Sequence, residues 1–317
     1  APDGDVTKGI DGYRLDVAEQ IGLGFWRDYH QYVKSINPEA YLGGEIWWQK
    51  WPDGLMDPAP YMQGDVFDAV MFYQVYKPAR SFFNNSDDAI DARQLRDSLE
   101  RQWNNIPGKN EYAMMNVGAS HDAPRLLSDF YNKNRYKFKA NPEENPGYKT
   151  GKPDKDAYTR TRLYLVHAFT TIGSPQIWNG DEMGMWGADD PNCRKPLMWP
   201  ELKMEKEYRN NFQPGAKQFD KIGFNKEHFE FYRKLIQLRK ENPVLSKGDL
   251  QFIISGGKKL GYFRTDGRER ITVLFNMEST RQRFELPENG SYVDLLTGKK
   301  IAGKSIVLKP LSAVVLK

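Results

Sequence analysis

Three short apolar segments of this chain each run into an acidic residue, and this pattern constrains the fold more than any other feature. The first segment ends at Asp16, the second at Glu45 and the third at Asp122. Short apolar runs that alternate with helical patterns are typical of parallel strands in an α/β protein. We expect the acids to gather on one rim, because the carboxyl ends of parallel strands lie at one edge. The alternative is three unrelated acids, each capping a helix.

The first acid has a cation two residues before it. Residues i and i+2 of a strand point to the same side, so Arg14 and Asp16 are expected to touch. A neighbouring cation favours the ionised carboxyl and keeps its pKa low, which suits a nucleophile. The alternative is an ordinary solvated surface pair.

The second and third acids have different neighbours. Glu45 is followed closely by Trp47 and Trp48. An apolar, aromatic setting raises the pKa of a carboxyl group by desolvation, as a general acid requires. The third segment ends in a pair, His121 and Asp122. The three segments together predict a site with carboxylates in distinct roles.

The rest of the chain divides into two regions. Helical spacing of apolar residues predicts helices over 23–36, 88–106, 158–171 and 228–241. We interpret the Lys/Asn/Pro-rich stretch at 132–155 as an exposed loop, and 179–226 as a long loop after the last strand of the first region. From 244 on, short alternating strands separated by Asp-Gly and Asn-Gly turns predict an antiparallel β-sandwich. The predicted domains are therefore 1–243 and 244–317.

Composition excludes several classes of protein. The net charge of +4, from 46 basic and 42 acidic residues, is too balanced to indicate nucleic-acid binding. A single cysteine, Cys193, excludes an internal disulfide, and four scattered histidines argue against a zinc site. No run of eighteen apolar residues predicts a membrane segment.

Four ordered motifs resemble a known family. Gly12–Ala18 (GYRLDVA), Gly43–Trp47 (GGEIW), Ala119–Arg125 (ASHDAPR) and Gly173–Glu182 are similar to motifs of the α-amylase family, glycoside hydrolase family 13. The neighbourhoods of the first two motifs are most similar to neopullulanase- and cyclomaltodextrinase-like members. The chain departs from typical α-amylases after the nucleophile motif, where it has Glu19-Gln20 in place of a Lys-His pair.

The resemblance implies a fold and a chemistry. The fold would be strands four to eight of a TIM (β/α)8 barrel followed by the β-sandwich. The activity would be retaining hydrolysis of α-1,4, and alternatively α-1,6, glucosidic bonds in starch-derived oligosaccharides. The resemblance gives catalytic roles to three acids and substrate-binding roles to three other residues: Asp16 as nucleophile, Glu45 as acid/base, Asp122 as transition-state stabiliser, with Arg14, His121 and Trp47 at the sugar. Trp47 would stack on a sugar or simply pack, and Arg125 would reach the site or cap a helix.

The resemblance also indicates what this chain lacks. The family's strand-three motif, which contacts the sugar, does not occur in this sequence. We therefore expect the chain to resemble the C-terminal half of an enzyme, to be inactive alone, and to pair with a missing N-terminal half or with itself. Its ligands would be α-glucan oligosaccharides. The chemistry requires no cofactor, and no pattern indicates the structural calcium that such proteins sometimes hold.

Two points stay open at this level. The alternative function is a catalytically inactive fragment, or a sugar-binding or scaffold module of the same fold. The cellular location of the complete protein is also undecided, with an extracytoplasmic one slightly favoured.

Overall fold

The structure, a computed structural model, describes residues 4–52, 54–209 and 218–317. Its contacts divide the chain into two compact units. Unit 1 takes in the residues up to Tyr76 together with Ser98–Val117 and Gly173–Gln176. Unit 2 takes in Lys77–Asp97, Gly118–Ile172 and Ile177–Lys317. Part of the predicted loop over 179–226 therefore lies outside the described residues.

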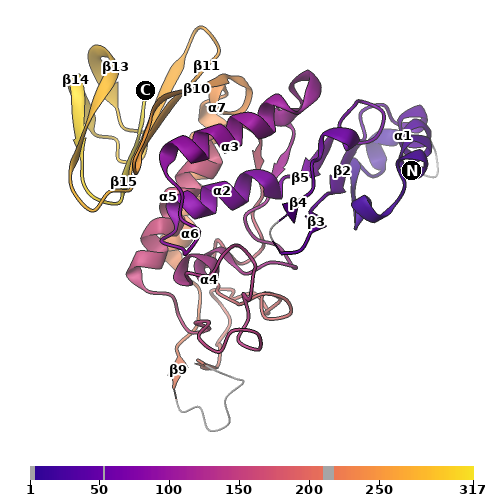
Figure 1. Cartoon of the computed structure of the whole chain (residues 1–317), viewed down its shortest axis with the longest axis horizontal. Coiled ribbons are helices and arrows are strands. Elements are labelled where there is room, and N and C mark those ends of the chain that lie inside the picture. Colours follow the sequence, from indigo (N-terminus) through magenta and orange to yellow (C-terminus); the bar gives the residue numbers. More distant parts are fainter. Residues whose placement is uncertain (1–3, 53, 210–217) are drawn as a thin grey trace. The chain divides into compact units, whose positions relative to one another are not determined.

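A parallel sheet of five strands forms the centre of unit 1 (Figure 1). Its strands stand in the order β1 (Gly12–Leu15), β2 (Tyr41–Glu45), β5 (Ala69–Met71), β6 (Met115–Asn116) and β7 (Ser174–Pro175). The predicted parallel α/β arrangement is confirmed. The last two strands are short, with two residues each.

Strand β2 owes its fit in this sheet to glycine. A Cβ atom at Gly44 would lie only 2.3 Å from Cε2 of Phe67, so a larger residue would displace that buried ring. Gly44 pairs with Leu15 of β1, and Glu45 pairs with Met71 of β5. The close approach of Phe67 to the backbone thus requires glycine at position 44.

Other elements of unit 1 connect or extend these strands. Helix α1 (Leu23–Ile36) joins β1 to β2 and ends at Asn37, one residue before Pro38, as predicted. A hairpin of β3 (Trp48–Lys50) and β4 (Gly54–Leu55) follows β2. Short 3₁₀ helices occupy Val6–Lys8, Ala18–Gln20, Ala59–Tyr61 and Pro107–Tyr112.

Unit 2 contains most of the helical residues and all of the C-terminal strands. Its helices are α4 (Leu126–Tyr131), α5 (Lys155–Thr170), α6 (Lys226–Glu241) and α7 (Val244–Lys247), while α2 (Tyr73–Phe83) and α3 (Ala92–Asn104) contain residues of both units. Asp154 caps α5 by accepting the Ala157 amide hydrogen, and Asn225 caps α6 in the same way through His228. A small antiparallel pair, β8 (Glu207–Tyr208) and β9 (Phe219–Asp220), lies in the loop before α6.

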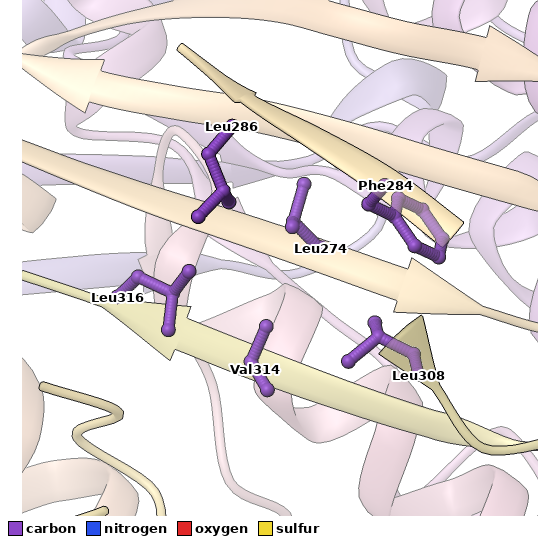
Figure 2. Packing of buried hydrophobic residues seen from close by; sticks show 6 residues of the cluster. All are labelled: Leu274, Phe284, Leu286, Leu308, Val314 and Leu316. Atoms are coloured by element: carbon purple, nitrogen blue, oxygen red, sulfur yellow. The ribbon is translucent and has the colours of Figure 1, made fainter. Parts of the chain in front are cut away.

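The C-terminal strands form two antiparallel sheets. One has the order β10 (Asp249–Gly256), β11 (Lys259–Thr265), β12 (Arg270–Asn276) and β15 (Ser312–Leu316), and the other pairs β13 (Gln282–Val293) with β14 (Lys300–Leu308). Figure 2 shows side chains from both sheets meeting in one apolar cluster, formed by Leu274, Phe284, Leu286, Leu308, Val314 and Leu316. Burying such faces against each other is what makes the predicted strand alternation stable.

The stretch at 132–155 differs from the prediction. It lacks regular strands and helices before Lys155, but it is not simply an exposed loop. Tyr136, Ala140 and Tyr148 are buried at 2%, 0% and 4% exposure. The aromatic residues among its lysines therefore pack inward.

No helix in the described part of the chain is long and apolar enough to cross a membrane.

A fully buried arginine ties β11 to the end of α5. The guanidinium of Arg264 donates to the carbonyl oxygens of Thr170 and Thr171 at 2.8 and 2.7 Å, and to those of Leu245 and Gly248 at 2.7 Å each. Carbonyl groups at a helix C-terminus need partners and favour a cation. Arg264 thus supplies hydrogen bonds that no apolar side chain would replace.

Replacing Arg264 tests this bridge. We expect Arg264→Leu to lower the free energy of unfolding by about 3–5 kcal/mol, because several buried carbonyl groups lose their donor. Arg268→Leu, at an exposed position of the following turn, should change it by less than about 0.5 kcal/mol. Urea denaturation followed by circular dichroism measures both, and equal effects would contradict the bridging role.

A strained turn follows β1. Val17 has φ 45° and ψ 39°, the left-handed conformation, which a β-branched residue rarely adopts. This turn directs the Val17 amide hydrogen to Oε2 of Glu45, 3.0 Å away. The backbone geometry after Asp16 is therefore held in place by a contact to the second acid.

Glycine substitution tests the strain. The left-handed conformation costs an L-residue about 1–2 kcal/mol, so Val17→Gly should raise the free energy of unfolding by about 1 kcal/mol. The control is Ile21→Gly, at a similarly exposed residue with φ −109°, which should lower it by about 0.5–1 kcal/mol. Chemical denaturation of both variants should give opposite signs; a shared loss would show that Val17 is not strained.

Candidate active site

Three charged side chains meet at the ends of β1 and β2. The Arg14 guanidinium contacts Asp16 through Nη1 and lies 2.9 Å from Oε1 of Glu45 through Nη2. Nε of Arg14 also lies 3.3 Å from the sulfur of Met71 on β5. The contact between Arg14 and Asp16 that the strand spacing predicts is present. One cation therefore holds two of the three predicted acids.

The two acids differ sharply in exposure. The side chain of Asp16 is 69% exposed, whereas that of Glu45 is 7% exposed. Burial favours a neutral carboxyl and the shared guanidinium favours a charged one, so Glu45 experiences opposing influences. Asp16 combines a cation partner with open access, which a nucleophile needs.

The electrostatics extend to Arg14 itself and to a third carboxyl group. Burial alone would lower the pKa of Arg14, but the bond to Asp16 and the charge of Glu45 outweigh it and raise that pKa. Glu19 lies on the 3₁₀ turn after Asp16 and is half-buried. Burial raises the pKa of Glu19, and the charges of Glu45 and Asp16 raise it further.

The aromatic residues after Glu45 pack on one another. The Trp47 ring stacks on that of Tyr73, with centroids 4.0 Å apart and planes 4° apart, and also on Trp48 at 5.2 Å. Trp47 is only 5% exposed in this structure. Of the two roles left open for Trp47, this packing favours the structural one. Trp51, which is 49% exposed and meets the edge of Trp48, is the more accessible ring.

The third acid belongs to unit 2 and has its own cation. Nε2 of His121 lies 2.9 Å from Oδ2 of Asp122, and Nη2 of Arg194 lies 2.8 Å from Oδ1. Nε of Arg194 also donates to the His121 carbonyl oxygen and lies 2.6 Å from Oδ1 of Asp190. Sequence reasoning assigned no role to Arg194, because 72 residues separate it from Asp122.

Arg125 does not cap α4 with its side chain, which was one of the two roles considered for it. It occupies the N-cap position of α4 without a side-chain capping bond, and it is 1% exposed. Its guanidinium lies 2.9 Å from Oδ1 of Asp181 and donates to the Asn179 carbonyl oxygen. Burial raises the pKa of Asp181 to about 6 despite this cation. Arg125 therefore anchors the segment that follows β7.

The remaining candidates for reactive or metal-binding groups are the thiol of Cys193 and clusters of metal-ligand side chains. Burial raises the pKa of the Cys193 thiol to about 11, so it stays protonated at neutral pH. Among the described residues, no group of three or more His, Cys, Asp and Glu side chains is arranged to hold a metal ion.

The chain is similar to known carbohydrate-active enzymes. The family model described as alpha amylase, catalytic domain, matches residues 5–248, and one described as beta-galactosidase C-terminal domain matches residues 262–317. A cyclomaltodextrinase of Geobacillus thermopakistaniensis (strain MAS1) is 32% identical over 304 residues, which are 94% of this chain and 42% of that protein. Neopullulanase 2 of Thermoactinomyces vulgaris is 30% identical over 98% of this chain and 46% of its own length.

Solved structures agree with the sequence comparison. A cyclomaltodextrinase structure superposes with a TM-score of 0.74 at 26% identity, covering 98% of this chain and 46% of that one. This chain thus spans a little under half the length of the curated relatives named above. The matched catalytic-domain model and the ordered motifs around Asp16, Glu45 and Asp122 lead to one conclusion: the chain belongs to the α-amylase family of glycoside hydrolases.

Proposed function

We propose that the protein acts as a retaining glycoside hydrolase on α-1,4, and alternatively α-1,6, glucosidic bonds of starch-derived oligosaccharides. The observation that carries this proposal is the pair of carboxylates, one exposed and one buried, held by the guanidinium of Arg14. A retaining enzyme needs its two carboxyl groups about 5–5.5 Å apart. Two carboxylates that share one guanidinium are compatible with that separation.

The first chemical step belongs to Asp16 and Glu45. A carboxylate oxygen of Asp16 attacks the anomeric carbon and forms a glycosyl ester, while the bond from that carbon to the leaving oxygen breaks. Glu45 gives its proton to the leaving oxygen. Arg14 orients Asp16 and keeps it ionised before the attack.

The second step reverses the proton transfer. Glu45, now a carboxylate, takes a proton from an incoming water molecule, whose oxygen displaces Asp16 from the anomeric carbon. The products are the free sugar, the regenerated Asp16 carboxylate and a protonated Glu45. A sugar hydroxyl in place of water gives transglycosylation by the same residues.

Asp122 and His121 complete the proposed machinery. We assign them to the hydroxyl groups of the reacting sugar, where their hydrogen bonds strengthen as positive charge develops on the ring. Arg194 acts on the sugar only through Asp122, which it orients, and is therefore a positioning residue. Trp47 supports the rings around Glu45 rather than stacking on a sugar.

The substrate class rests on the relatives. Two of them are a cyclomaltodextrinase and a neopullulanase, and a maltogenic alpha-amylase of Bacillus acidopullulyticus is 29% identical over 87% of this chain. We extend the shared α-glucan chemistry to this protein. The alternative is a module of the same fold that binds sugars without catalysis, and the presence of all three carboxylates argues against it.

We further propose a domain boundary and a required partner segment. The barrel portion, strands four to eight, runs to residue 243, and the β-sandwich begins at 244. In the described residues, β1 and β7 each have only one neighbouring strand in the sheet. A strand edge of this kind accepts another strand. The partner would be the N-terminal half found in the longer relatives, or a second copy of this chain.

Substitution of the two acids tests their roles in the complete enzyme. Asp16→Asn should lower kcat/KM by at least about 10³-fold while oligosaccharide binding persists, because the nucleophile is lost but the contacts remain. Glu45→Gln should slow substrates with poor leaving groups far more than activated aryl glycosides, which need no protonation. Steady-state kinetics on both substrate types provides the measurement.

A matched control keeps this test specific. Asp28→Asn changes an exposed acid on α1 and should leave kcat/KM within about two-fold of the parent value. Equal, mild losses for Glu45→Gln across all leaving groups would contradict its role as the acid.

The partner segment has its own test. Expressed alone, the 317 residues should self-associate and show no hydrolysis of maltooligosaccharides, because open sheet edges and apolar surface are exposed. Adding the N-terminal half in trans should restore part of the activity. Light scattering and a reducing-sugar assay measure both; a monodisperse monomer that hydrolyses maltooligosaccharides unaided would contradict the proposal.

A further inference from the structure

The lysine-rich segment after α4 encloses a cavity that the proposed catalysis does not use. The cavity has a volume of about 690 Å³ and lies entirely within unit 2. We call it the basic pocket and define it by the residues used below: Asp87, Lys133, Arg135, Phe138, Lys139 and Lys149. Its size is that of an ordinary small-molecule site.

The lining of the basic pocket is strongly cationic. Four of its residues carry positive charge at neutral pH, and Asp87 is the acid among them. Within the described parts of the chain, no ion pair involves Lys133, Lys139 or Lys149. Two other acids of unit 2 pair with cations outside this lining, Asp129 with Arg80 and Asp189 with Lys137. The pocket therefore concentrates positive potential.

Aromatic rings hold these cations together. Nζ of Lys149 lies 4.3 Å from the centroid of Tyr131. The Arg135 guanidinium and Nζ of Lys139 lie 5.2 and 5.4 Å from the centroid of the same ring, Phe138. Cations this close repel each other unless an anion or an aromatic face compensates them. The rings offset part of that repulsion, and the ammonium groups of Lys139 and Lys149 make no ion pair in the described parts of the chain.

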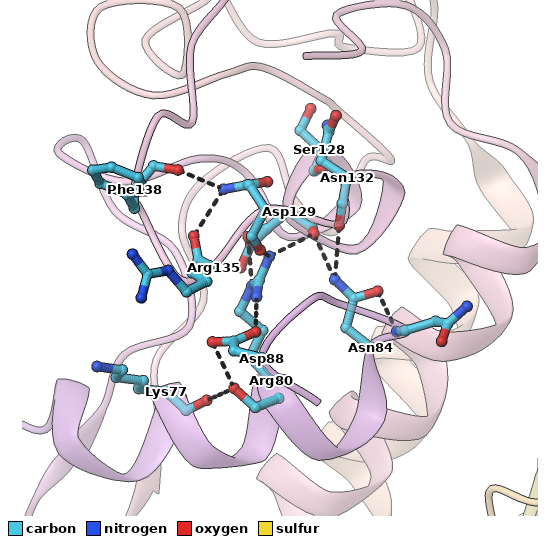
Figure 3. Close-up of polar contacts among 12 residues, drawn as sticks. Lys77, Arg80, Asn84, Asp88, Ser128, Asp129, Asn132, Arg135 and Phe138 are labelled. Carbon is cyan, nitrogen blue, oxygen red and sulfur yellow. Dashed lines mark hydrogen bonds and ion pairs between the residues drawn. The ribbon is translucent and has the colours of Figure 1, made fainter. Parts of the chain in front are cut away.

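The framework beneath the pocket is rigid. Arg80 is fully buried, with Nε 2.7 Å from Oδ1 of Asp129, and it donates to the Asn134 carbonyl oxygen at 2.8 Å (Figure 3). The side-chain amide of Asn134 donates to the carbonyl oxygens of Arg135 and Phe138. These bonds fix the backbone that carries Arg135 and Phe138, so the pocket exists before any ligand binds.

We propose that the basic pocket binds a small anion that carries phosphate or sulfate groups. Guanidinium and ammonium groups bind such oxyanions through charge-assisted hydrogen bonds. A neutral oligosaccharide fits less well, because sugar binding uses open aromatic faces and here cations lie over both rings. The lining of the basic pocket contains none of the three proposed catalytic acids, Asp16, Glu45 and Asp122.

Isothermal titration of the 317-residue chain with inorganic pyrophosphate tests the proposal. We expect saturable binding that weakens at least ten-fold between about 0.05 and 0.5 M NaCl, as screening of several charges requires. Inorganic sulfate in a parallel titration distinguishes the two oxyanions: tighter binding of pyrophosphate assigns the site to phosphate esters, and tighter binding of sulfate to sulfate esters.

Charge-neutralising variants locate the binding. The double variant Lys133→Gln/Lys149→Gln should weaken binding at least ten-fold. Lys139→Asn should also weaken binding. This substitution should leave the backbone conformation unchanged, because Lys139 has φ 52° and asparagine tolerates that conformation. The control is Lys304→Glu, at an exposed position on β14 outside the pocket, which should leave affinity within two-fold.

The possible outcomes are decisive. Absence of pyrophosphate and sulfate binding at low salt would overturn the proposal, as would equal losses in Lys304→Glu and in the pocket variants. Salt-independent binding of maltotriose that the pocket variants weaken would overturn it in favour of a neutral sugar site. Should a variant fail to fold by circular dichroism, the salt dependence and the maltotriose titration of the parent chain decide.

Discussion

The proposed chemistry depends on the ion pairs that the guanidinium of Arg14 makes with Asp16 and Glu45. Arg14 stands two residues before Asp16 on β1 and reaches Glu45 on the next strand, so one side chain fixes two acids from different parts of the sequence. The arrangement works because β1 and β2 are parallel and pair in register, with Arg14 opposite Gly43. Gly43 and Gly44 have no side chains. Glu45 follows them at the end of β2 and has a long side chain.

The ion pairs with a structural role and those with a proposed functional role differ in how much of their side chains is exposed. Arg80 with Asp129 and Arg125 with Asp181 are nearly inaccessible, and each of these arginines also binds backbone carbonyl groups. Breaking such a pair would leave a buried charge without compensation, which is energetically costly. The pairs therefore hold in place the loops whose carbonyl groups these arginines bind. Asp16 and Asp122 are paired to arginines as well, but their side chains are 69% and 31% exposed, as the roles proposed for them require.

The sequence predicts the framework better than the contacts. Helix α1 and the strand ends at Asp16 and Glu45 follow from local periodicity and from stop signals such as Asn37-Pro38. Helices α2 and α4 and strand β14 were not predicted: α2 contains Pro78, α4 has only six residues, and β14 contains Gly303 with φ 121°. Local patterns that weak are decided by tertiary packing.

The partners of the acids show where sequence reasoning stops. Arg14 was predicted because it is two residues from Asp16, and a strand has a fixed period. Arg194 reaches Asp122 across a loop whose path no local rule determines, and the Tyr136 and Tyr148 rings turn inward although lysines surround them. In both cases the missing information is the course of an irregular backbone. The lysines of the basic pocket follow the same course: beside the buried rings of Tyr136 and Tyr148, Lys139 and Lys149 stay exposed, whereas Lys137 turns inward and pairs with Asp189. When aromatic residues and lysines alternate in an irregular segment, we therefore expect a loop that packs against the protein. Its positive charges gather in one place, which distinguishes it from a solvated linker.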